Sequence, residues 1–174
     1  MRFYEALGLE PGLSLDAEDL KKRFYERSRQ WHPDRFGRAS AEDQAKALEM
    51  TAALNDAFRT LRDPVARAEY FLRESGMDLS KKEVPPELLE EVFELNMALE
   101  EVRGGDVGAR AQLESAELRF RAMLQDIDAS LTSLFARPQG QSMLEELRQT
   151  LNRRKYVTNL VRDVEKELHV HVSN

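Results

Sequence analysis

The sequence contains no cysteine, and this absence excludes several kinds of site at once. A chain without thiols forms no disulfide, no thiolate zinc site, no cysteine-held iron–sulphur cluster and no cysteine nucleophile. Glycine and proline are scarce, at 8 and 6 of 174 residues, which favours helices over turn-rich β structure. No apolar run exceeds three residues, so we expect neither a transmembrane helix nor a signal peptide, and a cytoplasmic location.

The chain carries a net charge of −6, and that charge is unevenly distributed. Seven basic residues lie between Lys21 and Arg38 against only Glu26 and Asp34, whereas positions 87–101 hold six glutamates and no basic residue. The overall acidity argues against nucleic acid or an anionic membrane as a partner. Two regions of opposite sign indicate two partners, or one very polar partner.

Helical periodicity runs through the whole sequence, and no period-two strand pattern interrupts it. In the N-terminal part the pattern predicts helices over 3–9, 16–31, 40–62 and 65–74. Gly8 is expected to end the first helix, and Asp16 and Ser40 to cap the second and third. Pro64 follows Asp63 and separates the third helix from the fourth.

A composition shift at residues 76–85, rich in glycine, lysine and proline, predicts a linker between two domains. The domains are then 1–75 and 86–174. In the second domain we expect helices over 86–103, from Asp106 to about Ala136, and over 142–168. Three helices joined by short loops predict an antiparallel bundle, so the fold class is all-α.

The most distinctive stretch runs from Leu20 to Asp34. Leu20, Phe24 and Trp31 fall on one helical face, and Pro33 ends the helix. The opposite face is basic, and its residues are Lys21, Lys22, Arg23, Arg27 and Arg29. A solvated helix face followed by an ordinary helix end is one interpretation. The other is a cationic docking surface that presents a fixed loop to an acidic partner.

The residues around this stretch resemble those of a J-domain. The matching features are the tripeptide His32-Pro33-Asp34, the basic helix before it, and the later Asn55-Asp56-Ala57-Phe58 segment. The run Arg67-Ala68-Glu69-Tyr70, followed by a short linker and an acidic three-helix bundle, is similar to the HscB family of co-chaperones for iron–sulphur cluster assembly. That resemblance covers nearly the whole chain.

The resemblance implies that the chain stimulates ATP hydrolysis by a DnaK-type chaperone of the HscA class and is not itself an enzyme. His32, Pro33 and Asp34 would act at the nucleotide-binding domain of the chaperone, with Lys21, Lys22 and Arg23 holding the docking face by charge. The bundle would bind the iron–sulphur scaffold protein and present it to the chaperone. No cofactor or metal is expected.

The helix over 86–103 carries two apolar stripes, and one of them is enough to face a bundle core. The second stripe, Leu89, Phe93 and Met97, lies about 100° around the helix and is edged by glutamates, which is typical of a binding surface. A wide core is the alternative explanation. The resemblance places Leu89, Phe93, Glu94 and Tyr156 at scaffold-contacting positions.

Two departures from the family pattern bear on these expectations. HscB proteins often carry Arg-Glu-Glu-Leu where this chain has Asn96-Met97-Ala98-Leu99, so the affinity for the scaffold or the choice of partner can differ. Arg27 replaces a leucine that commonly faces the third helix. Its aliphatic stem is expected to reach outward, or the two helices to pack differently.

Two other functions are compatible with parts of the sequence. A J-domain co-chaperone with a different client and a basic-helix nucleic-acid adaptor are the alternatives, and the acidity of the chain argues against the second. His169 and His171 stand without a nearby carboxylate or cysteine, so they indicate solvated side chains more than a metal pair. A monomer is expected for a one-to-one adaptor.

Overall fold

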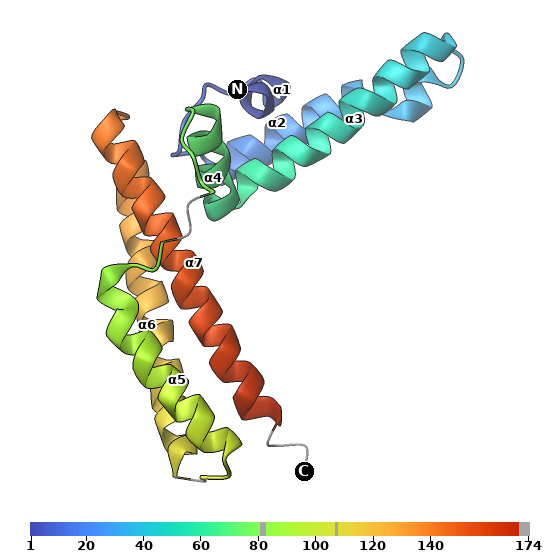
Figure 1. The fold of residues 1–174 in the computed structure, drawn as a ribbon. Coiled ribbons are helices and arrows are strands. Elements are labelled where there is room, and N and C mark those ends of the chain that lie inside the picture. Colours follow the sequence, from blue (N-terminus) through green and yellow to red (C-terminus); the bar gives the residue numbers. More distant parts are fainter. Residues whose placement is uncertain (81–82, 107, 171–174) are drawn as a thin grey trace. The chain divides into compact units, whose positions relative to one another are not determined.

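The computed structural model describes residues 1–80, 83–106 and 108–170, and every regular element in those residues is helical. The chain divides into two compact units, Met1–Leu79 and Ser80–Asn174. Within the described residues, helices α1 to α4 belong to the first unit and α5 to α7 to the second (Figure 1). The predicted all-α fold class is therefore confirmed. The predicted bounds 1–75, 76–85 and 86–174 stay a prediction, and Lys81, Lys82 and His171 lie outside the described residues.

The first unit is a long helical hairpin with a short helix at each side. Its hairpin is formed by α2 and α3, joined through a 3-10 turn. The bounds are α1 Arg2–Leu7, α2 Ala17–Gln30, η1 Pro33–Phe36, α3 Ala41–Arg62 and α4 Pro64–Glu74. Asp16 accepts a hydrogen bond from the Asp19 amide at 2.7 Å, and Ser40 accepts one from the Asp43 amide at 3.1 Å, so both predicted caps are confirmed.

Aromatic contacts hold this unit together. The Phe24 and Phe58 rings stack with centroids 4.3 Å apart, which joins α2 to α3. At the other end, Phe3 stacks on Tyr70 at 4.5 Å and joins α1 to α4. Tyr4 and Leu7 of α1 are fully buried, and α1 packs on α3. Burial of these side chains supplies most of the stabilisation of a small helical unit.

Two polar groups are buried beside this aromatic cluster, and each has a backbone partner. The Tyr4 hydroxyl donates to the Gly12 carbonyl at 2.8 Å, and the Arg67 guanidinium donates to the Leu61 carbonyl at 2.7 Å. Burial raises the pKa of Tyr4 to about 12, although the Arg67 charge opposes that rise. Burial likewise lowers the pKa of Arg67. Burial therefore favours the neutral hydroxyl of Tyr4 and opposes the positive charge of Arg67.

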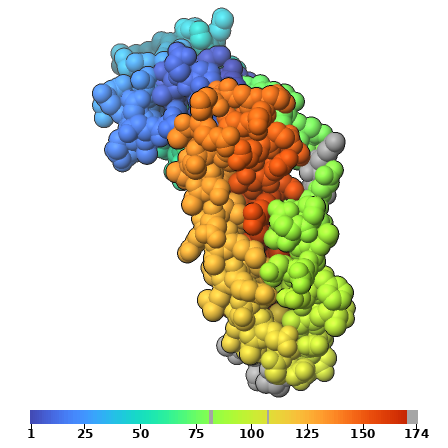
Figure 2. All heavy atoms as spheres, turned by 90° about the vertical axis from the view of Figure 1, so that its left-hand side faces the viewer, coloured from blue at the N-terminus to red at the C-terminus, as the bar shows by residue number. Residues whose placement is uncertain are grey.

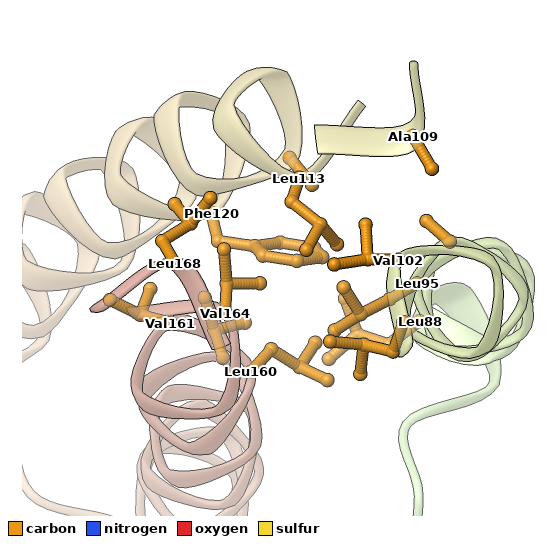
Figure 3. Packing of buried hydrophobic residues seen from close by; sticks show 14 of the residues in the cluster. Leu88, Leu95, Val102, Ala109, Leu113, Phe120, Leu160, Val161, Val164 and Leu168 are labelled. Carbon is orange, nitrogen blue, oxygen red and sulfur yellow. The ribbon is translucent and has the colours of Figure 1, made fainter. Parts of the chain in front are cut away.

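The second unit is an antiparallel three-helix bundle, as predicted. A 3-10 turn, η2 Pro86–Leu88, leads into α5 Leu89–Arg103, followed by α6 Ala109–Phe135 and α7 Gln141–Val170. Figure 3 shows Phe120 of α6 between side chains of α5 and α7, including Val102 and Val164. The first apolar stripe over 86–103 faces the core as expected, since Val92 is partly buried against it and the other four residues are buried, namely Leu88, Leu95, Leu99 and Val102.

The predicted start of α6 was wrong. Asp106 does not cap the helix, which begins at Ala109 after Gly108. Its carboxylate instead accepts a hydrogen bond from the Gly108 amide at 2.8 Å. Asp is as effective in such a turn as at a helix N-terminus, because its short side chain bonds the backbone two residues on.

Within the described residues, no helix combines the length and the apolar character needed to cross a membrane.

Raising the pH should destabilise the first unit through Tyr4. Because the pKa of Tyr4 in the folded chain is about 12 and the ordinary value is 10.0, the unfolded chain loses this proton first. Stability is then fully present below pH 10 and falls as the pH rises from about 10 to 12. Circular dichroism melts at pH 9 and pH 11 should show a smaller alkaline drop for Tyr4→Phe than for the unmodified chain. Equal drops would contradict this account.

Candidate partner-docking sites

The tripeptide His32-Pro33-Asp34 forms a structured turn at the junction of α2 and α3. Pro33 begins η1, so the fixed loop predicted after α2 contains a 3-10 turn, and Asp34 lies inside that turn. The His32 Nδ1 accepts from the Asp34 amide at 3.3 Å and lies 3.5 Å from the Asp34 carboxylate. The side chains of His32 and Asp34 are 58% and 89% exposed. The turn therefore displays two polar groups in a fixed local geometry.

A second set of contacts holds this turn on the hairpin. The Trp31 and Phe36 rings lie almost parallel with centroids 5.9 Å apart, and the Lys46 ammonium sits 5.9 Å from the Trp31 ring. The Trp31 carbonyl accepts from the Thr51 hydroxyl of α3 at 3.0 Å. Aromatic stacking and a cation–π contact contribute to keeping both ends of the turn in place.

The basic face of α2 divides into two groups with different surroundings. Lys21 and Lys22 are exposed. Arg23 instead donates to the Gly8 carbonyl at 2.6 Å and to the Asp19 carboxylate at 2.7 Å. The Arg27 guanidinium also lies against Gly8, whose φ of +65° ends α1. The Arg27 side chain, which stands where the family commonly has a leucine, therefore extends toward the end of α1.

Two exposed apolar side chains near the hairpin were not singled out from the sequence. Tyr25 of α2 and Leu48 of α3 are 53% and 59% exposed. Periodicity could have indicated Tyr25, because it follows the core residue Phe24 and shares the open face with Lys21, Lys22 and Arg29. Leu48 gave no such signal, since a leucine in an apolar pattern is expected inside.

The second unit presents an apolar surface on α5. Leu89, Phe93 and Met97 are 56%, 67% and 48% exposed, so this stripe does not enter the core. The wide-core explanation is therefore wrong for these three residues. Tyr156 of α7 is half-buried and packs against the bundle core. Whether these residues bind a scaffold protein stays a prediction.

Glu94 has a partner that the sequence did not reveal. The Arg119 guanidinium of α6 lies 3.6 Å from the Glu94 carboxylate and 3.3 Å from that of Glu91. The pair could not be predicted because it joins two helices whose relative rotation is set by packing. The ion pair therefore ties the Glu94 carboxylate, at the edge of the exposed apolar surface, to a cation of α6.

In the part of the chain that the structure describes, no cluster of three or more histidine, cysteine, aspartate or glutamate side chains could hold a metal ion. The His169 ring nitrogen Nδ1 lies 2.7 Å from the Glu165 carbonyl of its own helix.

Arg23 should contribute to stability in a way that Lys22 does not. Replacing Arg23 by alanine removes the bond to the Gly8 carbonyl, and we expect a loss of roughly 1 kcal/mol in the free energy of unfolding. Lys22→Ala is the matched control, with an expected change within about 0.5 kcal/mol because Lys22 is exposed. Urea unfolding followed by circular dichroism measures both. Equal stability of the two variants would show that the Arg23 contact is unimportant.

Comparison with known proteins agrees with this architecture. Residues 2–70 match the DnaJ domain family, and residues 84–165 match the family described as the HSCB C-terminal oligomerisation domain. The co-chaperone protein HscB homologue of Vibrio vulnificus (strain YJ016) is 30% identical over 168 residues, which cover 95% of each chain. The solved structure of chaperone HscB from Vibrio cholerae is 31% identical, covers 95% of this chain and 96% of its own, and superposes with a TM-score of 0.67.

The human co-chaperone protein HscB has the same fold. Its crystal structure is 21% identical, covers 96% of this chain and 82% of its own, and gives a TM-score of 0.70. The two matched families follow each other along the chain in the order of the two structural units. The chain therefore belongs to the HscB family of J-domain co-chaperones.

Proposed function

We propose that this protein stimulates ATP hydrolysis by an HscA/DnaK-type chaperone and delivers an iron–sulphur cluster scaffold protein to it. The observation that carries the proposal is the pairing of two different surfaces in one chain. The first unit exposes the His32-Pro33-Asp34 turn after α2 and two lysines near the start of α2, and the second exposes Leu89, Phe93 and Met97 beside glutamates. An adaptor needs two separate surfaces of this kind, because it holds two partners at once.

The first surface suits an acidic partner. Lys21 and Lys22 are exposed and supply long-range attraction, which raises the rate of encounter more than the final affinity. Tyr25 and Leu48 add apolar contact area, and Asp34 supplies a carboxylate that a chaperone cation can bind. Arg23 is the least available of the predicted docking residues, since it already bonds Gly8 and Asp19.

The second surface suits a partner with an apolar patch. Leu89, Phe93 and Met97 form its centre, and Glu94 and Tyr156 stand at its edges as the proposed scaffold-binding residues. Large exposed apolar side chains at the centre of a polar rim are the usual anchors of protein interfaces. Assembly or transfer of the cluster is the chemistry of the partners, and this chain contributes binding and positioning.

The proposed division of labour follows the predicted domains. Residues 1–75 would act on the chaperone, residues 86–174 would bind the scaffold protein, and residues 76–85 would connect them. We further propose a cytoplasmic monomer that binds one copy of each partner. Neither nucleic acid nor a membrane is part of this function.

A co-chaperone with a different client is the second candidate. Asn96 and Met97 are exposed on the proposed binding surface, where relatives often carry charges, whereas Ala98 is mostly buried. Two neutral side chains thus alter the surface itself. Isothermal titration with the scaffold protein from the same organism separates the candidates, because tight binding would count against a different client.

The turn is tested by single-turnover ATP hydrolysis with the HscA-type chaperone of the same organism. Stimulation by this protein should fall roughly tenfold or more in Asp34→Ala, because a central charged contact is lost. Asp56→Ala, which changes an exposed aspartate on α3, is the matched control and should stimulate normally. Adding the scaffold protein should increase stimulation by the unmodified chain. If Asp34→Ala and the unmodified chain stimulated equally, the proposed role of the turn would be wrong.

A further inference from the structure

A groove of about 550 Å³ runs between α5 and α6. Figure 2 shows α5, in green, beside α6, in yellow and orange, on one face of the second unit. The groove is lined on one side by Phe93, Glu94 and Met97 and on the other by Ala111, Ser115 and Arg119. The apolar surface proposed to bind the scaffold protein therefore continues past α5 to a second wall on α6.

The α6 wall is uncharged apart from Arg119. Ala111, Ser115, Leu118 and Ala122 are all exposed and share one face of the helix by the 3.6-residue repeat. Leu118 is 71% exposed. The neighbouring face of α6 carries charges that pair within the helix, Arg110 with Glu114 and Arg121 with Glu117. The small side chains of Ala111 and Ser115 let another backbone approach this wall closely, and Leu118 stands exposed beyond the groove.

The α5 rim of the groove is acidic. Glu90, Glu94 and Glu101 are exposed and fall on one side of α5, between Met97 and α6. Arg119 is the cation on the facing wall, and Glu91 and Glu94 already neutralise it. Glu90 and Glu101 therefore leave negative charge along an apolar groove, and a cationic occupant complements it.

We propose that this groove receives a cationic amphipathic helix of the scaffold protein, with α6 supplying half of the contact. The groove-lining stretch of α6 from Ala111 to Arg119 is about 12 Å long, which is about two turns of a docked helix. Apolar residues of that helix contact Phe93 and Met97, and its lysine or arginine side chains reach Glu90 and Glu101. The inference rests on the proposed function and adds residues to it that the family resemblance did not supply.

A second copy of this chain is the competing occupant. Two copies related by a two-fold axis through the groove would bring Glu90, Glu94 and Glu101 close to the same residues of the other copy. Like charges placed opposite each other in an interface are unfavourable. The charge of the rim therefore favours a partner of different sequence.

The test is isothermal titration of the full-length protein with the scaffold protein at low and at physiological salt. Ser115→Arg adds bulk and positive charge inside the groove, and Ser115→Glu adds bulk with negative charge. Ser133→Arg is the matched control, because Ser133 is exposed on the same face of α6 about five turns, or roughly 27 Å, further along. Phe93→Ala probes the α5 surface of the proposed function. Circular dichroism melts check that each variant is folded.

We expect Ser115→Arg to weaken binding about tenfold and more at low salt than at high salt, because screening reduces charge repulsion. Ser115→Glu should bind better than Ser115→Arg, and Ser133→Arg should bind like the unmodified chain. Equal weakening by the two Ser115 variants would refute a cationic occupant.

The other outcomes separate this inference from the function on which it rests. Loss of binding in Phe93→Ala with normal binding in Ser115→Arg would overturn the groove and leave the α5 surface intact. Absence of binding by the unmodified chain would overturn both. Sedimentation of the protein alone tests the second copy, because a dimer broken by Ser115→Arg but not by Ser133→Arg would assign the groove to self-association.

Discussion

The packing of α6 against α7 is the interaction on which the second unit depends. These two helices, Ala109–Phe135 and Gln141–Val170, are much longer than α5 and bury a continuous row that includes Phe120, Ile127 and Val157. Once that pair is formed, α5 needs only one of its apolar stripes to join it. Its second stripe is left in solvent, because a helix can face a single core. The exposed surface on α5 is thus a direct result of giving two apolar stripes to the shortest helix of the bundle.

The charged side chains of α2 and α5 also divide into two groups, those that make contacts within the fold and those that stay exposed. On α2, Arg23 and Arg27 are drawn to the end of α1, while the neighbouring lysines stay exposed. On α5, Glu91 and Glu94 pair with Arg119 of α6, while Glu90 and Glu101 have no such neighbour among the ion pairs of the described residues. Exposed ion pairs contribute little to stability, so the unpaired charges matter chiefly for which partners approach.

Local signals in the sequence were enough to predict most of the fold. The caps at Asp16 and Ser40, the end of α1 at Gly8 and the core stripe of α5 each depend on a few neighbouring residues, and the structure has all of them. The start of α6 and the contacts between helices were not predicted, for two physical reasons. Asp106 is a residue type that favours both helix caps and turns, and here its carboxylate bonds the Gly108 amide in a turn. The contacts of Arg23 with Gly8 and of Arg119 with Glu94 join separate helices, so they depend on rotations that only packing determines.

The Arg27 side chain of α2 lies against Gly8, the residue that ends α1. A methyl group built on Gly8 would come within 2.5 Å of the Arg27 Nη2, and the backbone there is left-handed, with φ at +65°. The first obstacle is minor, because the guanidinium is the far end of a flexible side chain and can move aside. The second is intrinsic to any residue with a Cβ atom. Position 8 is therefore constrained by its own backbone conformation, whichever residue stands at position 27. Glycine at position 8 also leaves the space that the Arg27 guanidinium occupies.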